Sequence, residues 1–68
     1  MKLKLTDEQM NQMLKLPEQG MGYHVVDIKL KNGTVLSERI ILDSRYVQLN
    51  QDEKISAFDI ETIQLHQL

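Results

Sequence analysis

The chain has 68 residues, a formal net charge of −2, a pI near 5.5 and no cysteine. This length predicts one domain, residues 1–68, with a single core. Without cysteine there is no disulfide or thiolate metal site, and His24 and His66 lack ligand spacing, so we expect neither a metal nor a cofactor. The acidic balance disfavours nucleic-acid binding through phosphates. No apolar run could span a membrane, and we expect a cytoplasmic domain without membrane contact.

A short amphipathic helix is predicted over residues 5–16. Thr6 can cap its start, and Gln9, three residues on, can complete a capping box. Apolar residues then recur at helical spacing. Pro17 disfavours helical geometry in the residue before it and so ends the helix.

Gly20 and Gly22 flank a methionine between this helix and the next predicted element. A phosphate-binding loop needs its glycines after a strand and before a helix. Here the order is reversed, because the helix comes first. We therefore interpret these glycines as residues that let the chain turn a corner, through positive φ or close backbone approach.

Residues 23–31 alternate between apolar and polar side chains, which predicts a half-buried strand. Asn32-Gly33 is a strong hairpin signal, and the return strand runs over 34–42. A three-residue loop with a left-handed Gly33 sets Ile28 opposite Leu36. The residues of the return strand that this register turns inward are Leu36, Ile40 and Leu42, with Glu38 as the misfit.

The rest of the chain predicts a turn at Asp43-Ser44, strands over 45–50, 54–58 and 62–66, and a helical turn over 59–61. The fold class is therefore mainly β (α+β by count): a helix, then an antiparallel meander over 23–66 that curls into a small barrel of four to five strands. The alternative is an open four-stranded sheet with the helix across one face. The expected core is Met13, Leu14, Val26, Ile28, Leu30, Leu36, Ile40, Val47, Leu49, Ile55, Phe58, Ile60 and Ile63.

No catalytic constellation is visible, because the serines and histidines are scattered and the carboxylates fall in predicted turns. We therefore expect no enzyme. Tyr46 is a candidate binding residue, since it lies on the strand face opposite Val47. Exposed aromatics stack on bases or anchor protein partners, and Arg39, Arg45 and Gln48 could converge with it. The other interpretation is that Tyr46 covers a second apolar layer.

Three segments resemble the Sm and Sm-like family of small SH3-like barrels. VDIKLKNGTVLSERIIL (26–42) is similar to the family's first hairpin, and ISAFDIETIQL (55–65) to its fourth strand, helical turn and fifth strand. DSRYVQLN (43–50) resembles the segment that contacts bases. The resemblance implies a stacking role for Tyr46, a polar contact from Gln48 and a loop-orienting role for Asp43. Ala57-Phe58 stand where the family often has a basic pair.

Two functions remain open from the sequence. The first is a non-enzymatic interaction module whose partner is a protein or a second copy of the chain, with Val25, Val35 and Ile41 leaving apolar surface on the outer side of the sheet. The second is an RNA-binding protein that uses Tyr46 and Gln48. The acidic pI favours the protein-binding module.

Overall fold

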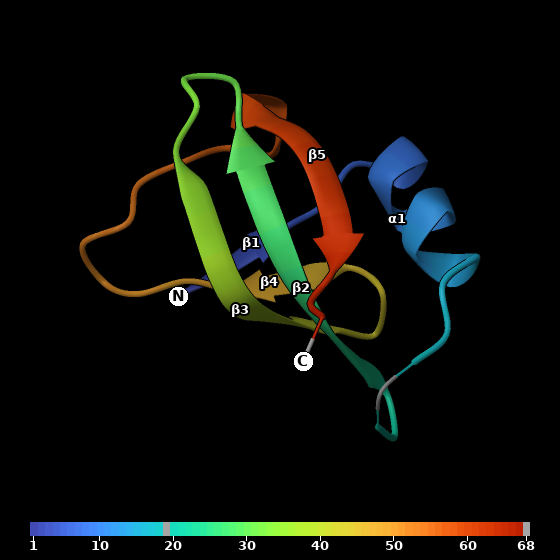
Figure 1. Cartoon of the computed structure of the whole chain (residues 1–68). Helices are drawn as coiled ribbons and strands as arrows, with labels where there is room; N and C mark the ends of the chain where they lie inside the picture. Colours follow the sequence, from blue (N-terminus) through green and yellow to red (C-terminus); the bar gives the residue numbers. More distant parts are fainter. Residues whose placement is uncertain (19, 68) are drawn as a thin grey trace.

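The structure is a computed structural model that describes residues 1–18 and 20–67. Its described strands form one antiparallel sheet in the order β1-β4-β3-β2-β5 (Figure 1), so the prediction of a mainly β domain is confirmed. The sheet is strongly bent but not closed, because β1 and β5 are its two edges. The elements are β1 (Lys2–Lys4), α1 (Asp7–Leu14), β2 (Tyr23–Leu30), β3 (Val35–Leu42), β4 (Tyr46–Gln48), the 3-10 helix η1 (Ala57–Asp59) and β5 (Ile60–Leu65).

The predicted capping box of α1 is confirmed. Thr6 Oγ1 accepts a hydrogen bond from the Gln9 N–H at 3.2 Å, and Gln9 Oε1 accepts one from the Thr6 N–H at 3.0 Å. The helix ends at Leu14, two residues earlier than predicted, where the Lys15 N–H bonds back to the Gln12 carbonyl at 3.2 Å and tightens the last turn. Met13 is buried in the core, but Leu14 is 64% exposed. The prediction that Leu14 is a core residue was therefore wrong.

The sheet edge beside β4 is formed by β1, a strand that was not predicted. Leu3 pairs with Val47, so the two apolar residues point inward together.

The strand predicted over 54–58 is not formed, because residues 57–59 are the 3-10 helix η1. Ser56 N–H donates to Asp59 Oδ2 at 2.8 Å, which stabilises this helical turn two residues before its predicted place. β5 accordingly starts at Ile60 rather than at residue 62, and the sheet is not a simple meander.

The β2–β3 hairpin has the predicted register at its turn. Gly33 is left-handed with φ 93°, and Ile28 pairs with Leu36. Further along, however, Val26 pairs with Arg39, so that Asp27 faces two residues of β3 instead of one. This is a β-bulge, and Glu38, the misfit of the sequence pattern, adopts a positive φ of 54° within it.

The bulge reverses which residues of β3 face the core after Glu38. Ile41 is completely buried, whereas Ile40 is 37% exposed. The extra residue shifts the alternation by one position, and a shift of one exchanges the two faces of a strand. Three predictions were therefore wrong: Ile40 is not a core residue, Leu42 does not face inward but lies on the outer side with its partner Tyr46, and Ile41 does not lie on that outer side.

The interpretation of the two glycines as corner residues is confirmed. Gly22 has a φ of 81°, and a Cβ on Gly20 would collide with the ring of Tyr23, which lies directly against it. Gly20 also forms an isolated bridge with Tyr23. The chain reverses sharply here and leaves Met21 fully exposed at the tip.

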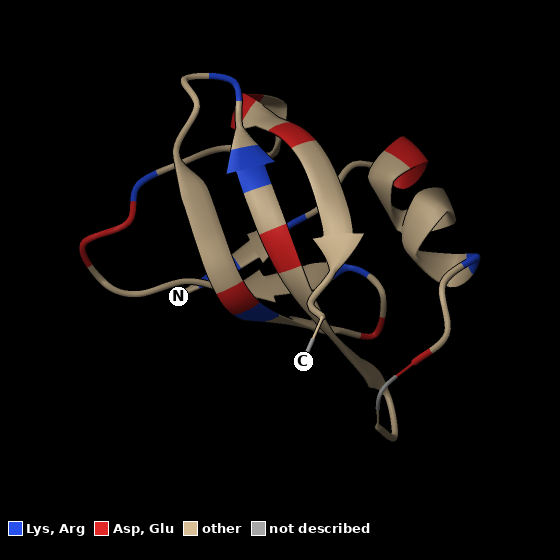
Figure 2. Ribbon diagram, in the orientation of Figure 1, with Lys and Arg blue, Asp and Glu red and all other residues tan. Residues whose placement is uncertain are grey.

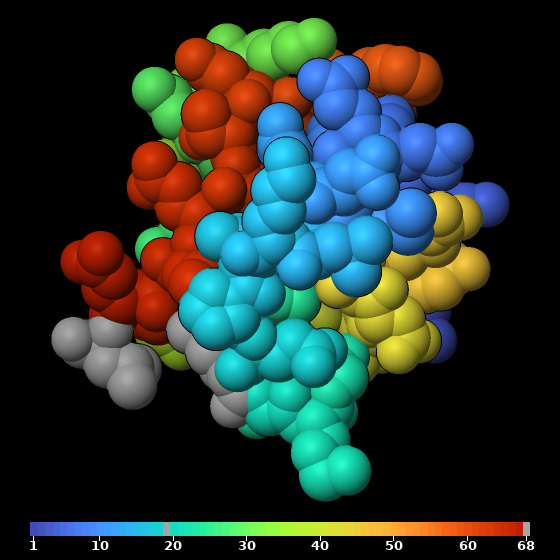
Figure 3. Space-filling model, turned by 90° about the vertical axis from the view of Figure 1, so that its right-hand side faces the viewer, coloured from blue at the N-terminus to red at the C-terminus, as the bar shows by residue number. Residues whose placement is uncertain are grey.

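The core lies inside the bend of the sheet, and α1 covers the open side. Figure 3 shows α1 between β5 and the segment that joins β3 to β4. Gln9 Nε2 donates to the Ala57 carbonyl at 2.9 Å and so ties the helix to η1.

The observed core differs from the predicted one at three further residues. Phe58 is 73% exposed and is not a core residue, and Ile55 and Ile63 are only partly buried. The buried apolar residues are Leu5, Met13, Val26, Ile28, Leu30, Leu36, Ile41, Val47, Leu49, Ala57 and Ile60.

Candidate functional site

Arg39 does not join Tyr46 in a binding site, because the bulge turns it toward the inner side of the sheet, where it pairs with Val26 of β2. Its guanidinium makes two hydrogen bonds to the Glu53 carboxylate, at 2.9 Å and 2.6 Å. Glu53 Oε1 also accepts from the Asn50 N–H at 2.8 Å. This paired, mostly buried contact fastens the loop after β4 to β3, so Arg39 has a structural role.

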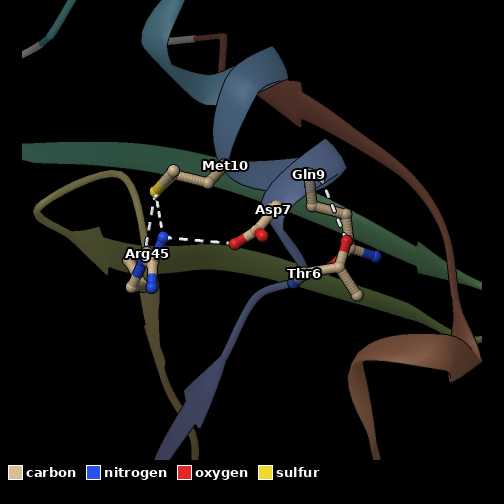
Figure 4. A network of polar contacts seen from close by, with 5 residues as sticks. All are labelled: Thr6, Asp7, Gln9, Met10 and Arg45. Atoms are coloured by element: carbon tan, nitrogen blue, oxygen red, sulfur yellow. Dashed lines mark hydrogen bonds and ion pairs between the residues drawn. The ribbon is translucent and has the colours of Figure 1, made fainter.

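Arg45 is likewise engaged elsewhere. Its Nε and Nη2 donate to the sulfur of Met10 at 3.1 Å and 2.7 Å, and Nη2 lies 3.4 Å from Asp7 Oδ1 (Figure 4). These contacts join the β3–β4 turn to the first turn of α1. Asp43 lies in that β3–β4 turn, exposed and with a φ of 54°, where it shapes the hairpin.

Tyr46 and Gln48 do point outward, as predicted from their alternation with Val47. Tyr46 stands in an unbroken row across four strands, because it pairs with Lys4 on one side and with Leu42 on the other, and Leu42 pairs with Tyr23. Both tyrosines of the chain therefore lie on the same face of the sheet, separated by one leucine.

A second row runs beside the first. Lys2 pairs with Gln48, and Ile40 pairs with Val25. The helix packs on the opposite, inner side of the sheet through Met13. The outward lysines, Ile40 and Gln48 are exposed, whereas the tyrosines, Val25 and Leu42 are half-buried. We call this surface the outer face; it consists of Lys2, Lys4, Tyr23, Val25, Ile40, Leu42, Tyr46 and Gln48.

Sequence reasoning missed most of the outer face. Lys2 and Lys4 were not placed beside Tyr46 because β1 was not predicted, although the alternation of lysine and leucine at the start of the chain is a period-two signal. Ile40 was assigned to the core because the bulge was not recognised. Tyr23 was assigned to the first strand, but no pattern near it places it opposite Leu42.

A polar cluster lies where β2, β3 and the end of β5 meet. His66 Nδ1 is 2.8 Å from Asp27 Oδ1, and His66 Nε2 is 3.4 Å from Glu38 Oε1. The Glu38 N–H donates to Asp27 Oδ1 at 3.0 Å. This backbone hydrogen bond, followed by the hydrogen bond with His66, lowers the pKa of the Asp27 carboxyl below its ordinary value of 3.8. The ionised Asp27 thus stabilises the bulge.

We expect replacement of Asp27 by asparagine to reduce stability at neutral pH but not in strong acid. Because the pKa of Asp27 is lower in the folded state, its charge contributes stability that is complete above the ordinary pKa and is lost as the pH falls through the folded-state value. Urea unfolding of wild type and Asp27→Asn from about pH 5 to about pH 2 should show two curves that converge on the acid side of pH 3.8. Asp52→Asn, in an exposed loop, is the control. A difference that stays constant over this range would contradict the role of the charge.

His24 does not belong to this cluster. It is buried, and its Nε2 lies 3.1 Å from the Leu16 carbonyl oxygen, which holds the segment after α1 against β2.

Among residues 1–18 and 20–67, the structure contains no helix with the length and apolarity needed to cross a membrane.

Comparison of the chain with protein-family models, with curated proteins and with solved structures finds no match. The outer face is therefore interpreted from its own chemistry.

Proposed function

We propose that the protein is a non-enzymatic interaction module of the cytoplasm and that it binds a protein partner through the outer face. The observation that carries this proposal is the unbroken row Tyr46, Leu42 and Tyr23 across β4, β3 and β2. Tyrosine supplies a large contact area and a hydroxyl at low entropic cost, and tyrosine is enriched at protein interfaces and at their energetic centres.

The composition of the outer face supports a protein surface in two further ways. Ile40 and Val25 extend the apolar centre beside the tyrosine row, as expected for the dry core of an interface. Lys2 and Lys4 form a charged margin on β1. Such a surface fits a partner with an apolar patch and acidic residues along one side, because opposite charges at an interface rim speed association and select the partner.

For the fold we propose a variant of the Sm-like, SH3-like small barrel in which α1, rather than strand pairing, covers the gap between the sheet edges. Three features support this proposal: the hairpin at Asn32-Gly33, the 3-10 turn η1 before the last strand, and the strong bend of the sheet. Besides the missing basic pair at Ala57-Phe58, the sheet edge departs from the family pattern, since β1 takes the place next to β4 that a fourth strand over 54–58 would fill.

RNA binding is the second candidate function, and one observation favours it. Lys4 lies directly opposite Tyr46, and Lys2 lies opposite Gln48, so two cations flank the aromatic ring that the Sm-like resemblance assigns to base stacking. The contacts of Arg39 and Arg45 weigh against it, because both guanidinium groups are already engaged by acidic or sulfur partners.

A salt-dependent titration separates the two candidates. Short uridine-rich and adenosine-rich RNAs would be added to wild type and to Tyr46→Ala at low and at moderate salt. We expect no binding to either RNA, even at low salt. Binding that weakens steeply with salt, and that loses about 1–3 kcal/mol in the alanine variant while the fold is retained, would make RNA binding the function instead.

A further inference from the structure

An open groove that Tyr46 does not line lies between α1 and the segment η1–β5. Its volume is about 370 Å³. The floor includes Ala57 and Ile60, both buried, and the Gln9–Ala57 hydrogen bond joins the two walls beneath it. Phe58, the single phenylalanine of the chain, stands on the η1 wall with 73% of its surface exposed.

The exposure of Phe58 has no structural benefit for the isolated domain. Burial of a phenylalanine side chain stabilises a protein by about 1.5–3 kcal/mol, and in this chain the 3-10 turn instead directs the ring outward beside a groove. Ser56 and Asp59 hold that turn through a hydrogen bond of 2.8 Å, so the ring is presented by an ordered segment. An aromatic ring held in this way at the edge of a groove is a typical anchor for a partner.

The charges around the groove indicate what kind of partner fits. Glu8 on α1 and Glu61 on β5 line opposite walls, and among the described residues neither forms an ion pair. Figure 2 shows acidic segments at the start of α1 and around the start of β5. Lys31 is the cation that lines the groove, and the two glutamates outnumber it. A ligand here would need positive charge on both sides of its apolar group.

We propose that this groove binds a basic peptide segment of a partner protein, in which one apolar side chain packs on Phe58 and flanking lysine or arginine residues pair with Glu8 and Glu61. The outer face carries lysines and the groove carries glutamates, so the domain has two docking surfaces of opposite charge. This inference concerns a surface separate from the outer face and holds or fails independently of the proposed function.

The test uses synthetic peptides and the complete chain. The probes are acetylated, amidated pentapeptides with a central leucine flanked by two lysines on each side, together with twins in which glutamate or glutamine replaces every lysine. Amide chemical shifts of the labelled protein report where each peptide binds. We expect the lysine peptide to shift the resonances of α1, η1 and the start of β5, more strongly at low salt, and the glutamate twin to leave them unchanged.

Three variants sharpen the result. Phe58→Ser and the double variant Glu8→Gln/Glu61→Gln should each weaken binding of the lysine peptide by about tenfold. Leu14→Ser is the matched control, because Leu14 is an exposed apolar residue of α1 that does not line the groove. This variant should bind the lysine peptide with the same affinity as wild type. The proposal is overturned if the groove resonances do not move at low salt, if the glutamate twin binds as well, if Phe58→Ser binds like wild type, or if the shifts map to the outer face instead.

Discussion

Replacement of Ile41 by alanine is expected to lower the free energy of unfolding by about 2–5 kcal/mol. Ile41 belongs to β3, and its side chain is completely buried in the core. Truncation therefore removes buried methyl groups and leaves a cavity. A domain of this size has a total stability of about 3–10 kcal/mol, and the variant should therefore be partly or largely unfolded. Urea unfolding followed by circular dichroism measures the change.

The neighbouring isoleucine is the matched control. Ile40→Ala removes the same atoms from the outer face and should cost less than about 1 kcal/mol. If Ile41→Ala does not fold at all, Ile41→Val, which should cost about 0.5–1.5 kcal/mol, keeps the comparison measurable against Ile40→Val. Equal costs at the two positions, or a larger cost at Ile40, would mean that the bulge at Glu38 is not where the structure places it.

Replacement of Met13 by alanine is expected to have an effect of similar size, about 2–5 kcal/mol. Met13 is 1% exposed and is the buried residue of α1, so it is the contact that packs the helix against the core. A helix of eight residues is not stable by itself in water. Loss of this contact should therefore release the helix from the open side of the sheet as well as create a cavity.

Leu14→Ala is the control for Met13, because it changes a neighbouring apolar residue that is largely exposed. Alanine has the highest helix propensity, so this variant should be as stable as wild type within about 0.5 kcal/mol. Urea unfolding of the two variants under the same conditions measures the difference. A large loss in Leu14→Ala, or none in Met13→Ala, would show that α1 packs by a different face.

The elements that were predicted correctly are specified by residues close together in the sequence. The capping box depends on Thr6 and Gln9, three positions apart, and the hairpin turn depends on Asn32 and Gly33. Each signal contains its own partner, so no distant contact is needed to interpret it. The corner at Gly20 is of the same kind, since the ring that excludes a side chain there belongs to Tyr23.

The elements that were missed depend on partners far away in the chain. The misfit at Glu38 signalled an irregularity, but the bulge is fixed by a hydrogen bond to Asp27, eleven residues earlier on another strand. The three-residue strand β1 exists because β4 offers a free edge. The expected strand over 54–58 is an exception, because it was missed for a local reason: a cap between Ser56 and Asp59, three residues apart, forms in its place.

The candidate site was half predictable for the same reason. Alternation with the apolar Val47 was sufficient to predict that Tyr46 and Gln48 point outward. Nearness in sequence also suggested that the two arginines join them, but Arg39 pairs with Glu53 and Arg45 reaches the first turn of α1. The residues that do surround Tyr46 come from β1, β2 and β3, and only the sheet order brings these strands together.

The most direct test of the outer face is photo-crosslinking from a single position. The chain contains no cysteine, so Ile40→Cys provides a unique thiol for a diazirine maleimide, and Leu14→Cys on α1 provides the control. Each labelled protein would be irradiated in an extract of the cells that produce it, and the adducts treated with ribonuclease or with protease.

We expect a discrete adduct from position 40 that resists ribonuclease and is destroyed by protease. Position 14 should give a weak adduct or none. The position-40 adduct should also decrease when Tyr46→Ala is combined with Ile40→Cys. Equal adducts from both positions, or a position-40 adduct that ribonuclease converts back to the free chain, would contradict a protein-binding outer face.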